Sequence, residues 1–237
     1  MESERGMREF DADPIRSTPL FRDVSDTSFA ALTGAAFLQR FPANVQLIEE
    51  GEPADFLHVV VEGLVELFAR HEGRESTLAF ARPPATFILA AVVSDRVYLK
   101  SARTLAPSRI LMIPAETVRT VFETDTGFAR AVVRELALRY RDLVKELKTL
   151  KLRTGTERLA NWLLAADLEA GGPGQIRLPC EKRTLASRLG MTPENLSRAF
   201  AALAGHGVSI KGRDVRLDRR VLEAFGKPSP LIDDFKI

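Results

Sequence analysis

The fold is decided by residues 181–207, which read EKRTLASRLGMTPENLSRAFAALAGHG. Apolar residues repeat at helical spacing in two blocks, and Gly190 between them is the residue type that accepts a left-handed conformation at a helix end. Thr192 is expected to cap the second helix, with Pro193 at its first position. The pattern predicts two short helices joined by a tight turn, which is a helix-turn-helix.

The second predicted helix has one apolar and one polar face. Its apolar stripe consists of Leu196, Phe200 and Leu203. The polar face carries Asn195, Ser197 and Arg198 near the helix start, where a recognition helix contacts base edges. Taken alone, the stretch also fits an ordinary helical hairpin with a solvated charged face.

The flanking residues favour DNA binding over a plain hairpin. A short strand is expected at residues 176–178, and two further runs, 208–210 and 215–217, flank a turn. A hairpin directly after a recognition helix is a wing. Residues 175–220 also hold ten Lys or Arg against four Asp or Glu, a basic patch that suits a phosphate backbone.

The chain of 237 residues has the composition of a globular protein, with 45% hydrophobic and 28% charged residues and a formal net charge of +2. Its single cysteine, Cys180, excludes an intramolecular disulfide and any zinc or iron–sulfur cluster built from cysteines alone within one chain. No stretch approaches the ~20 apolar residues of a membrane span, and no signal-peptide core is present. We therefore expect a cytoplasmic protein without membrane contact.

Residues 40–114 are predicted to form an antiparallel β-roll or jelly roll. Short apolar runs are separated by Gly, Pro and acidic residues, and Gly51, Gly63 and Gly73 fall between runs at regular spacing. A helix is expected before them, within residues 24–38. The expected strands are residues 45–48, 56–61, 64–68, 76–80, 87–93 and 109–113. A sandwich without a pocket is the alternative.

A long helix is predicted from residue 125 to residue 152, because apolar residues recur there at steps of three and four. About 28 residues at ~1.5 Å each give roughly 42 Å, which is longer than a small domain needs for itself. A two-fold homodimer through this helix is therefore expected. The predicted interface residues are Leu136, Tyr140, Leu143, Leu147 and Leu150.

Residues 153–156 interrupt the helical pattern and are predicted to be a hinge, with Thr156 capping the next helix. The predicted fold class is α+β. The predicted domains are a β-roll effector-sensing domain (1–124), a dimerisation helix (125–152), the hinge (153–156) and a winged helix-turn-helix DNA-binding domain (157–237).

This order of parts resembles the CRP/FNR family of bacterial transcription factors over roughly residues 18–220. In the β-roll, residues 41–68 (FPANVQLIEEGEPADFLHVVVEGLVELF) are similar to the family segment in which a Gly-Glu pair precedes a strand and a further glycine. In the DNA domain, residues 185–203 (LASRLGMTPENLSRAFAAL) resemble the family's helix-turn-helix. The resemblance implies a homodimeric DNA-binding regulator, not an enzyme, that works with RNA polymerase and responds to a small-molecule effector.

The family motif Glu-x-x-Ser-Arg is present as Glu194, Ser197 and Arg198. Arg can donate two hydrogen bonds to guanine, Glu can accept from cytosine N4, and Ser is small enough to approach a thymine methyl. The serine-containing motif is similar to that of the oxygen and nitric-oxide responders, which implies a TTGA-like inverted repeat. The expected DNA-backbone contacts are Thr192, Lys211 and Arg213. A solvated turn is the alternative for the last two.

The effector site departs from the cyclic-nucleotide pattern. Family members that bind cyclic AMP carry a Gly-Glu-Leu segment and an Arg-Ser pair, which correspond here to Leu89-Ala90-Ala91 and Lys100-Ser101. Ala90 supplies no carboxylate for the ribose, and Lys100 lacks the two-pronged fork of arginine. The resemblance thus implies an effector other than cyclic AMP, with a cyclic-nucleotide-responsive regulator as the alternative. An iron–sulfur cluster of the family's type is excluded, because its N-terminal cysteines are absent.

Haem is the cofactor that the remaining pattern suggests. The apolar run within residues 80–93 suits haem or another hydrophobic effector, and the helix-turn-helix looks like that of the dissimilatory nitrate respiration regulators, which implies nitric-oxide sensing through haem. His58, in a predicted strand, is the candidate ligand, and a satisfied core or surface histidine is the alternative. A cupin-like barrel enzyme is the remaining rival, but the barrel has no His-x-His or paired-carboxylate motif, so no metal site is predicted.

Overall fold

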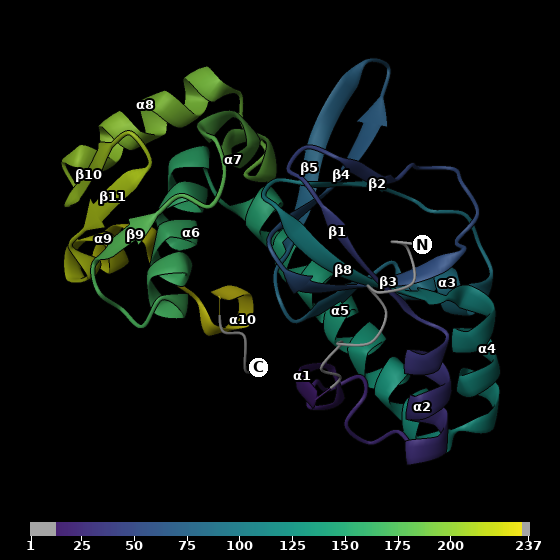
Figure 1. The fold of residues 1–237 in the computed structure, drawn as a ribbon. Coiled ribbons are helices and arrows are strands. Elements are labelled where there is room, and N and C mark those ends of the chain that lie inside the picture. Colours follow the sequence, from purple (N-terminus) through teal and green to yellow (C-terminus); the bar gives the residue numbers. More distant parts are fainter. Residues whose placement is uncertain (1–12, 234–237) are drawn as a thin grey trace. The chain divides into compact units, whose positions relative to one another are not determined.

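The computed structural model describes residues 13–233 and divides the chain into two compact units (Figure 1). The first unit ends at Arg139 and the second begins at Tyr140, so the long helix α5 (Thr126–Leu152) contributes to both. Within the described range, no helix is both long and apolar enough to cross a membrane.

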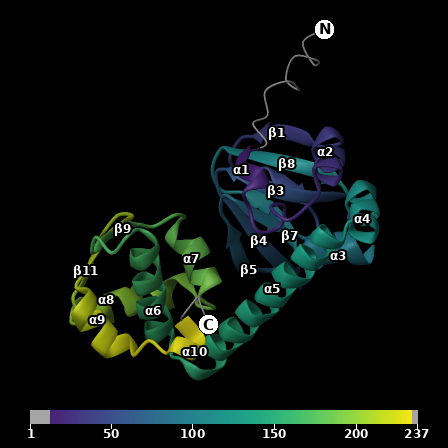
Figure 2. The same ribbon diagram turned by 90° about the horizontal axis from the view of Figure 1, so that it is seen from below.

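The first unit is built on two four-stranded antiparallel sheets (Figures 1 and 2), with the strand orders β1-β8-β3-β6 and β2-β7-β4-β5. The strands are β1 (Phe37–Phe41), β2 (Gln46–Ile48), β3 (Phe56–Glu62), β4 (Val65–His71), β5 (Arg74–Ala81), β6 (Ala85–Phe87), β7 (Ser101–Thr104) and β8 (Ser108–Pro114). The helices are α1 (Asp13–Arg16), α2 (Asp26–Gly34), α3 (Leu89–Ser94), α4 (Ala115–Thr124) and the start of α5. This architecture confirms the predicted antiparallel β-roll.

One hydrophobic core joins the two sheets. Leu57 and Val59 of β3 and Val65 and Leu67 of β4 belong to the same cluster of buried side chains. Each pair is two residues apart, which is the period at which a strand returns side chains to one face. Phe128 of α5 is fully buried in this core as well, so the N-terminal part of the long helix is fixed to the β-roll.

The structure corrects the prediction of a strand at residues 87–93. Phe87 ends strand β6, and Leu89–Ser94 forms helix α3 instead. Ile88 between them has a left-handed backbone (φ 69°), which a strand cannot continue. A short buried helix and a buried strand both give a continuous apolar run, so periodicity could not distinguish them. Strands β1 and β7 were not predicted.

Asp125 fixes the beginning of α5. Its carboxylate accepts a hydrogen bond from the Ser25 hydroxyl at 2.6 Å and another from the backbone N–H of Phe128 at 2.8 Å. These hydrogen bonds, led by that of Ser25, hold the pKa of Asp125 well below its usual range. The same carboxylate therefore orders the helix start and the loop before α2.

The second unit contains the end of α5, five further helices and a three-stranded sheet of order β10-β11-β9 (Figure 1). The helices are α6 (Gly155–Glu169), α7 (Lys182–Arg188), α8 (Pro193–Ala204), α9 (Arg219–Gly226) and α10 (Pro230–Asp233). The strands are β9 (Gln175–Arg177), β10 (Val208–Lys211) and β11 (Asp214–Leu217). Helix-turn-helix, hairpin and preceding strand agree with the prediction, whereas α9 and α10 were not predicted.

The residue that caps α6 is Thr154, not the predicted Thr156. The Thr154 hydroxyl accepts from the backbone N–H of Glu157 at 3.3 Å, and the Glu157 carboxylate accepts from the backbone N–H of Thr154 at 2.7 Å. This reciprocal pair is a capping box, whose Thr-x-x-Glu spacing is visible in the sequence. Helix α6 therefore starts at Gly155, and the non-helical connection from α5 shrinks to Arg153 and Thr154.

Candidate nucleic-acid interface

The turn between α7 and α8 has the geometry that its sequence predicts. Gly190 adopts a left-handed conformation (φ 62°), and the backbone N–H of Met191 donates to the carbonyl of Ala186 at 2.9 Å. The Thr192 hydroxyl then accepts from the backbone N–H of Asn195 at 3.2 Å, with Pro193 at the first position of α8. A glycine that closes one helix and a threonine that caps the next together fix the crossing of the two helices.

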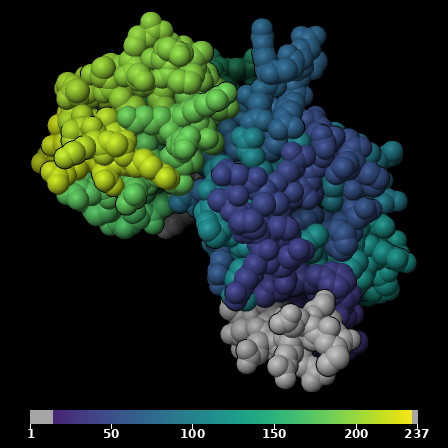
Figure 3. Space-filling view, turned by 45° about the horizontal axis from the view of Figure 1, so that its top comes forward, coloured from purple at the N-terminus to yellow at the C-terminus, as the bar shows by residue number. Residues whose placement is uncertain are grey.

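Helix α8 divides into a buried and an exposed face. The buried residues are Leu196, Ala199, Phe200 and Leu203. The exposed residues in its first two turns are Glu194, Asn195, Ser197 and Arg198. In the space-filling view, the yellow-green residues of this region lie at the surface of the unit (Figure 3). The structure thus brings the three sequence-predicted base-reading residues together on one accessible surface.

Two side chains of this surface are oriented by their neighbours. Arg198 donates from Nη2 to the side-chain oxygen of Asn195, so the guanidinium is held by the helix that carries it. Hydrogen bonds from its own backbone N–H and from the Thr192 hydroxyl lower the pKa of Glu194, with Arg198 adding a favourable charge. Glu194 is therefore a carboxylate and a pure acceptor, whereas Arg198 offers only donors.

The hairpin of β10 and β11 places its two predicted backbone-contacting residues differently. Lys211 is exposed at the end of β10. Arg213 donates from Nε and Nη2 to the carbonyl of Leu178, at 3.0 and 2.8 Å. Part of the Arg213 guanidinium thus serves to hold the hairpin against the chain before α7. Its remaining donors, Lys211 and the exposed Arg216 are positive charges that this hairpin offers to a partner.

Arg158 is a residue of this region that sequence reasoning missed. It donates from Nε to the carbonyl of Leu189 at 2.8 Å and from Nη1 to the carbonyl of Arg153 at 2.8 Å. Its guanidinium also borders a cavity of about 450 Å³ that lies beside α8. The lining residues are Gly155, Thr156, Arg158, Gly190, Met191, Asn195, Arg198, Ala199 and Ala202. No local sequence pattern could have shown that Arg158 connects α6 with the helix-turn-helix, because Leu189 is 31 residues away.

The predicted stripe of α5 is exposed along most of its length. Tyr140, Leu143, Leu147 and Leu150 are 69, 63, 52 and 50% exposed. Leu136 differs, since it is half-buried and packs against the core of the first unit. Four large apolar side chains at helical spacing on one accessible face are unusual for a surface helix, which normally turns such a stripe toward a core.

The predicted effector residues of the β-roll do not form one pocket. Ala90 is exposed on α3, Lys100 is half-buried before β7, and Ser101 is buried at the start of β7. The Ser101 hydroxyl accepts from the backbone N–H of Glu50 at 3.0 Å. The neighbouring apolar residues Phe87, Ile88, Leu89 and Val92 are all buried in the core cluster. They fill the core of the β-roll rather than line an open cavity.

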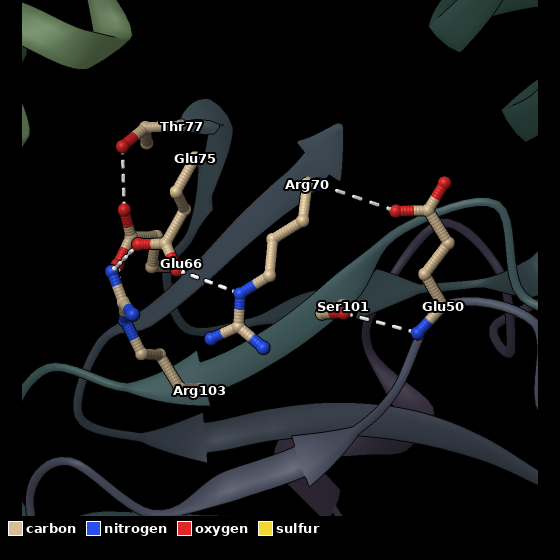
Figure 4. A network of polar contacts seen from close by, with 7 residues as sticks. All are labelled: Glu50, Glu66, Arg70, Glu75, Thr77, Ser101 and Arg103. Carbon is tan, nitrogen blue, oxygen red and sulfur yellow. Dashed lines mark hydrogen bonds and ion pairs between the residues drawn. The ribbon is translucent and has the colours of Figure 1, made fainter. Parts of the chain in front are cut away.

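A polar network lies on the same sheet as Ser101 (Figure 4), since Arg103 follows Ser101 by two residues in β7. Glu66 is 1% exposed and accepts from Arg103 Nε at 2.7 Å. Arg103 also donates to Glu75 at 2.6 Å, and Arg70 donates to the same carboxylate at 3.0 Å. Contacts with both arginines lower the pKa of Glu75 against the opposing effect of burial. Arg70 and Arg103 are thus neutralised by carboxylates of the chain itself.

His58 lies in the sheet formed by β1, β8, β3 and β6 and is 1% exposed. Its ring stacks on Phe87 with 5.1 Å between the ring centroids, and burial lowers its pKa to about 4. Nδ1 has no hydrogen-bond partner among residues 13–233. The neutral imidazole also has a hydrogen bond to the backbone of Phe56, which leaves Nδ1 as the nitrogen that could bind iron. Because His58 is 1% exposed, haem ligation would require the core around this side chain to open, and the role of His58 as a haem ligand stays a prediction.

No group of three or more His, Cys, Asp or Glu suited to a metal occurs in the part of the chain that the structure describes.

Comparison with protein families gives two matches in chain order. Residues 38–125 match the cyclic nucleotide-binding domain, and residues 157–225 match the Crp-like helix-turn-helix domain. Together they cover more than half of the chain, and each lies within one of its two units.

Three known proteins illustrate the similarity. The CRP-like cAMP-activated global transcriptional regulator of Mycobacterium tuberculosis is 25% identical over 202 residues, which are 83% of this chain and 90% of that protein. The structure of FixK2 from Bradyrhizobium japonicum has a TM-score of 0.73 at 24% identity, covering 82% of this chain and 98% of that one, and shows the same fold. DNR from Pseudomonas aeruginosa is 25% identical with a TM-score of 0.50, covering 92% and 99%.

Proposed function

The chain belongs to the CRP/FNR family of transcription regulators, and on this premise we propose that it is a homodimer that recognises a TTGA-like inverted repeat. The observation that carries the proposal is the exposed surface of Glu194, Ser197 and Arg198 at the start of α8. The opposite face of α8 is buried in the second unit. Such a helix can enter a major groove without losing its own packing.

Each of the three side chains has a base that it suits. Arg198 would donate two hydrogen bonds to the O6 and N7 atoms of guanine, and its contact with Asn195 restricts the orientations that it samples. Glu194, as an ionised acceptor, would accept from cytosine N4. Ser197 is exposed and donates to the carbonyl of Pro193 at 3.0 Å, and its small side chain would approach a thymine methyl. Thr192, Lys211 and Arg213 would contact the phosphates.

The exposed stripe of α5 supports the homodimer. Two copies of Tyr140, Leu143, Leu147 and Leu150 packed about a two-fold axis would bury the apolar surface that each copy exposes. A symmetric dimer would place its recognition helices in successive major grooves, about 34 Å apart, which explains an inverted repeat. RNA polymerase is the protein partner that regulation of transcription from such a site would involve.

For the β-roll we propose sensing of a small effector other than cyclic AMP. Ala90 offers no carboxylate, Ser101 is engaged with Glu50, and Arg70 and Arg103 are paired with carboxylates. A cyclic phosphate would therefore meet Lys100 as the charge at the position where the family uses arginine. Calorimetric titration should detect no binding of cyclic AMP at micromolar concentration, and a micromolar Kd would favour the cyclic-nucleotide alternative.

The DNA proposal is tested by fluorescence anisotropy with a labelled inverted TTGA repeat and a scrambled duplex. The parent protein should prefer the repeat, and Arg198→Ala should weaken that binding by about 1–3 kcal/mol per half-site. Arg74→Ala, which removes an exposed arginine of β5 in the first unit, is the matched control and should change binding little. Equal binding of parent and Arg198→Ala to both duplexes would refute the proposal.

A further inference from the structure

The C-terminal end of the described chain folds back onto the connection between α5 and α6. Asp233, the last residue of α10, accepts from Nη1 and Nη2 of Arg153 at 2.7 and 2.5 Å. The side chains of Arg153 and Asp233 are only 9% and 23% exposed. A two-bonded arginine–carboxylate pair that is shielded from water is geometrically specific, unlike most surface ion pairs.

Helix α10 is fixed by polar contacts rather than by a core. It is four residues long and has no buried residue. The Asp233 carboxylate also accepts from the backbone N–H of Ser229 at 2.7 Å, so it closes the turn of α10 as well. Lys148 of α5 donates to the carbonyl of Leu231 at 3.3 Å. Loss of the Asp233 charge would therefore remove the main attachment of the whole segment.

The connection is held from the other side by α6. Arg158 donates to the carbonyl of Arg153 and, through Nε, to the carbonyl of Leu189 in the helix-turn-helix. Arg153 is thus fixed through its side chain by the C-terminal segment and through its backbone by α6. Because Arg153 and Thr154 are the only non-helical residues between α5 and α6, fixing Arg153 fixes the angle between these helices within the second unit.

Both partners of this contact lie outside the segments that the family models match. The helix-turn-helix match covers residues 157–225, whereas Arg153 precedes it and Asp233 follows it. The cyclic nucleotide-binding match ends at residue 125. The contact therefore joins two segments that lie outside both family matches.

We propose that α10 is a latch, closed by Asp233 on Arg153, that sets the angle between α5 and α6. The consequence for DNA rests on the proposed function: α5 carries the exposed stripe, and α6 is tied through Arg158 to the turn that precedes the recognition helix. A closed latch pre-organises this connection, so less conformational entropy is lost when both half-sites are occupied. An open latch leaves the angle variable and weakens binding.

Amide hydrogen exchange of the full-length protein tests the latch directly. Asp233→Asn keeps the shape of the side chain but removes its charge, and should accelerate exchange in residues 150–158 by about ten-fold. Glu169→Gln, which removes an exposed carboxylate at the end of α6, is the matched control and should leave it unchanged. Acceleration of three-fold or less in Asp233→Asn would overturn the latch.

A charge exchange separates the ion pair from a general loss of stability. Arg153→Asp alone should accelerate exchange as Asp233→Asn does, and the double variant Arg153→Asp with Asp233→Arg should recover at least part of the protection. Failure of the double variant to slow exchange relative to Arg153→Asp would contradict a direct pair. Recovery in the double variant would show that the two side chains act on each other.

Binding to the inverted TTGA repeat gives the second readout. Asp233→Asn should bind more than about three-fold more weakly than the parent, while Glu169→Gln binds as the parent does. Faster exchange with unchanged affinity would overturn the control of DNA binding by the latch. If the parent itself showed no preference for the repeat, the proposed function would fail, whereas the exchange measurement would still decide whether α10 closes the connection.

Discussion

The polar network of the β-roll and the exposed face of α8 use their charged and polar residues in opposite ways. In the β-roll, Glu66 and His58 are 1% exposed, and Glu66 meets its partner Arg103 across 37 positions of sequence. In the second unit, Glu194 and Arg198 are exposed within two turns of one helix. A surface that meets a large external partner can be built from neighbouring residues, whereas an interior must be assembled from distant strands.

The largest expected effect comes from the exposed apolar stripe of α5, which consists of Tyr140, Leu143, Leu147 and Leu150. Leu143→Asp combined with Leu147→Asp places two carboxylates on the proposed dimer face, so the protein should sediment as a monomer. Its affinity for the inverted repeat should fall by more than about 100-fold, because the second half-site no longer binds from the same particle. Sedimentation velocity and anisotropy measure the two quantities.

Since both leucines are more than half exposed, the folded monomer should persist with an unchanged circular dichroism spectrum. Arg141→Asp, an exposed position of α5 away from the stripe, is the control and should remain dimeric. A dimer that survives the two aspartates would show that α5 is not the interface.

His58 provides a test of the buried polar side chains of the β-roll. Burial lowers the pKa of His58 from 6.5 to about 4. Between these two pH values the imidazole is therefore protonated in the unfolded chain and neutral in the folded chain. Stability should therefore fall as the pH drops through this window, by about 3 kcal/mol in total. Urea unfolding of His58→Gln should lack this part of the pH dependence.

The parent and a variant at another histidine provide the reference. His71→Gln changes an exposed residue at the end of β4 and should retain the full loss of stability between pH 6.5 and pH 4. An equal slope in the parent and in His58→Gln would mean that His58 is protonated in the folded β-roll, and the contrast between a buried and an exposed unit would lose its main support.

The smallest effect is expected at the capping box of α6. Thr154→Ala removes the hydroxyl that accepts from Glu157 and should lower the free energy of unfolding by about 1 kcal/mol. Thr154→Ser keeps that acceptor and should recover most of the loss. Thermal unfolding compares the two variants, and an equal loss in both would assign the effect to the methyl group instead of the cap.

The helix-turn-helix could be predicted from sequence because its determinants are local. Gly190, Thr192 and Pro193 each act on backbone groups within a few residues, and the structure places all three as their chemistry requires. The same locality made the Thr-x-x-Glu capping box of α6 readable, although the cap was assigned to Thr156 instead of Thr154. Thr154 and Thr156 are both candidates for the cap, and only the position of Glu157 decides between them.

The effector region could not be predicted in the same way. Leu89, at the start of a continuous apolar run, was expected in a strand and lies in α3, because the left-handed turn at Ile88 has no sequence signal. The pairings of Ser101 with Glu50 and of Arg153 with Asp233 span 51 and 80 positions. Such contacts follow from the tertiary fold, so residue type alone could not show that these side chains are already engaged.

The most direct test of base reading by α8 is a double-mutant cycle between Arg198 and the guanine of the TTGA half-site. The Kd values of the parent and of Arg198→Ala are measured on inverted repeats with TTGA and with TTAA half-sites. If Arg198 contacts this guanine, either change alone should weaken binding by about 1–3 kcal/mol per half-site, and the second change should add little once the first is made. Fully additive losses would contradict base reading by Arg198, because they would show that its side chain does not contact this guanine.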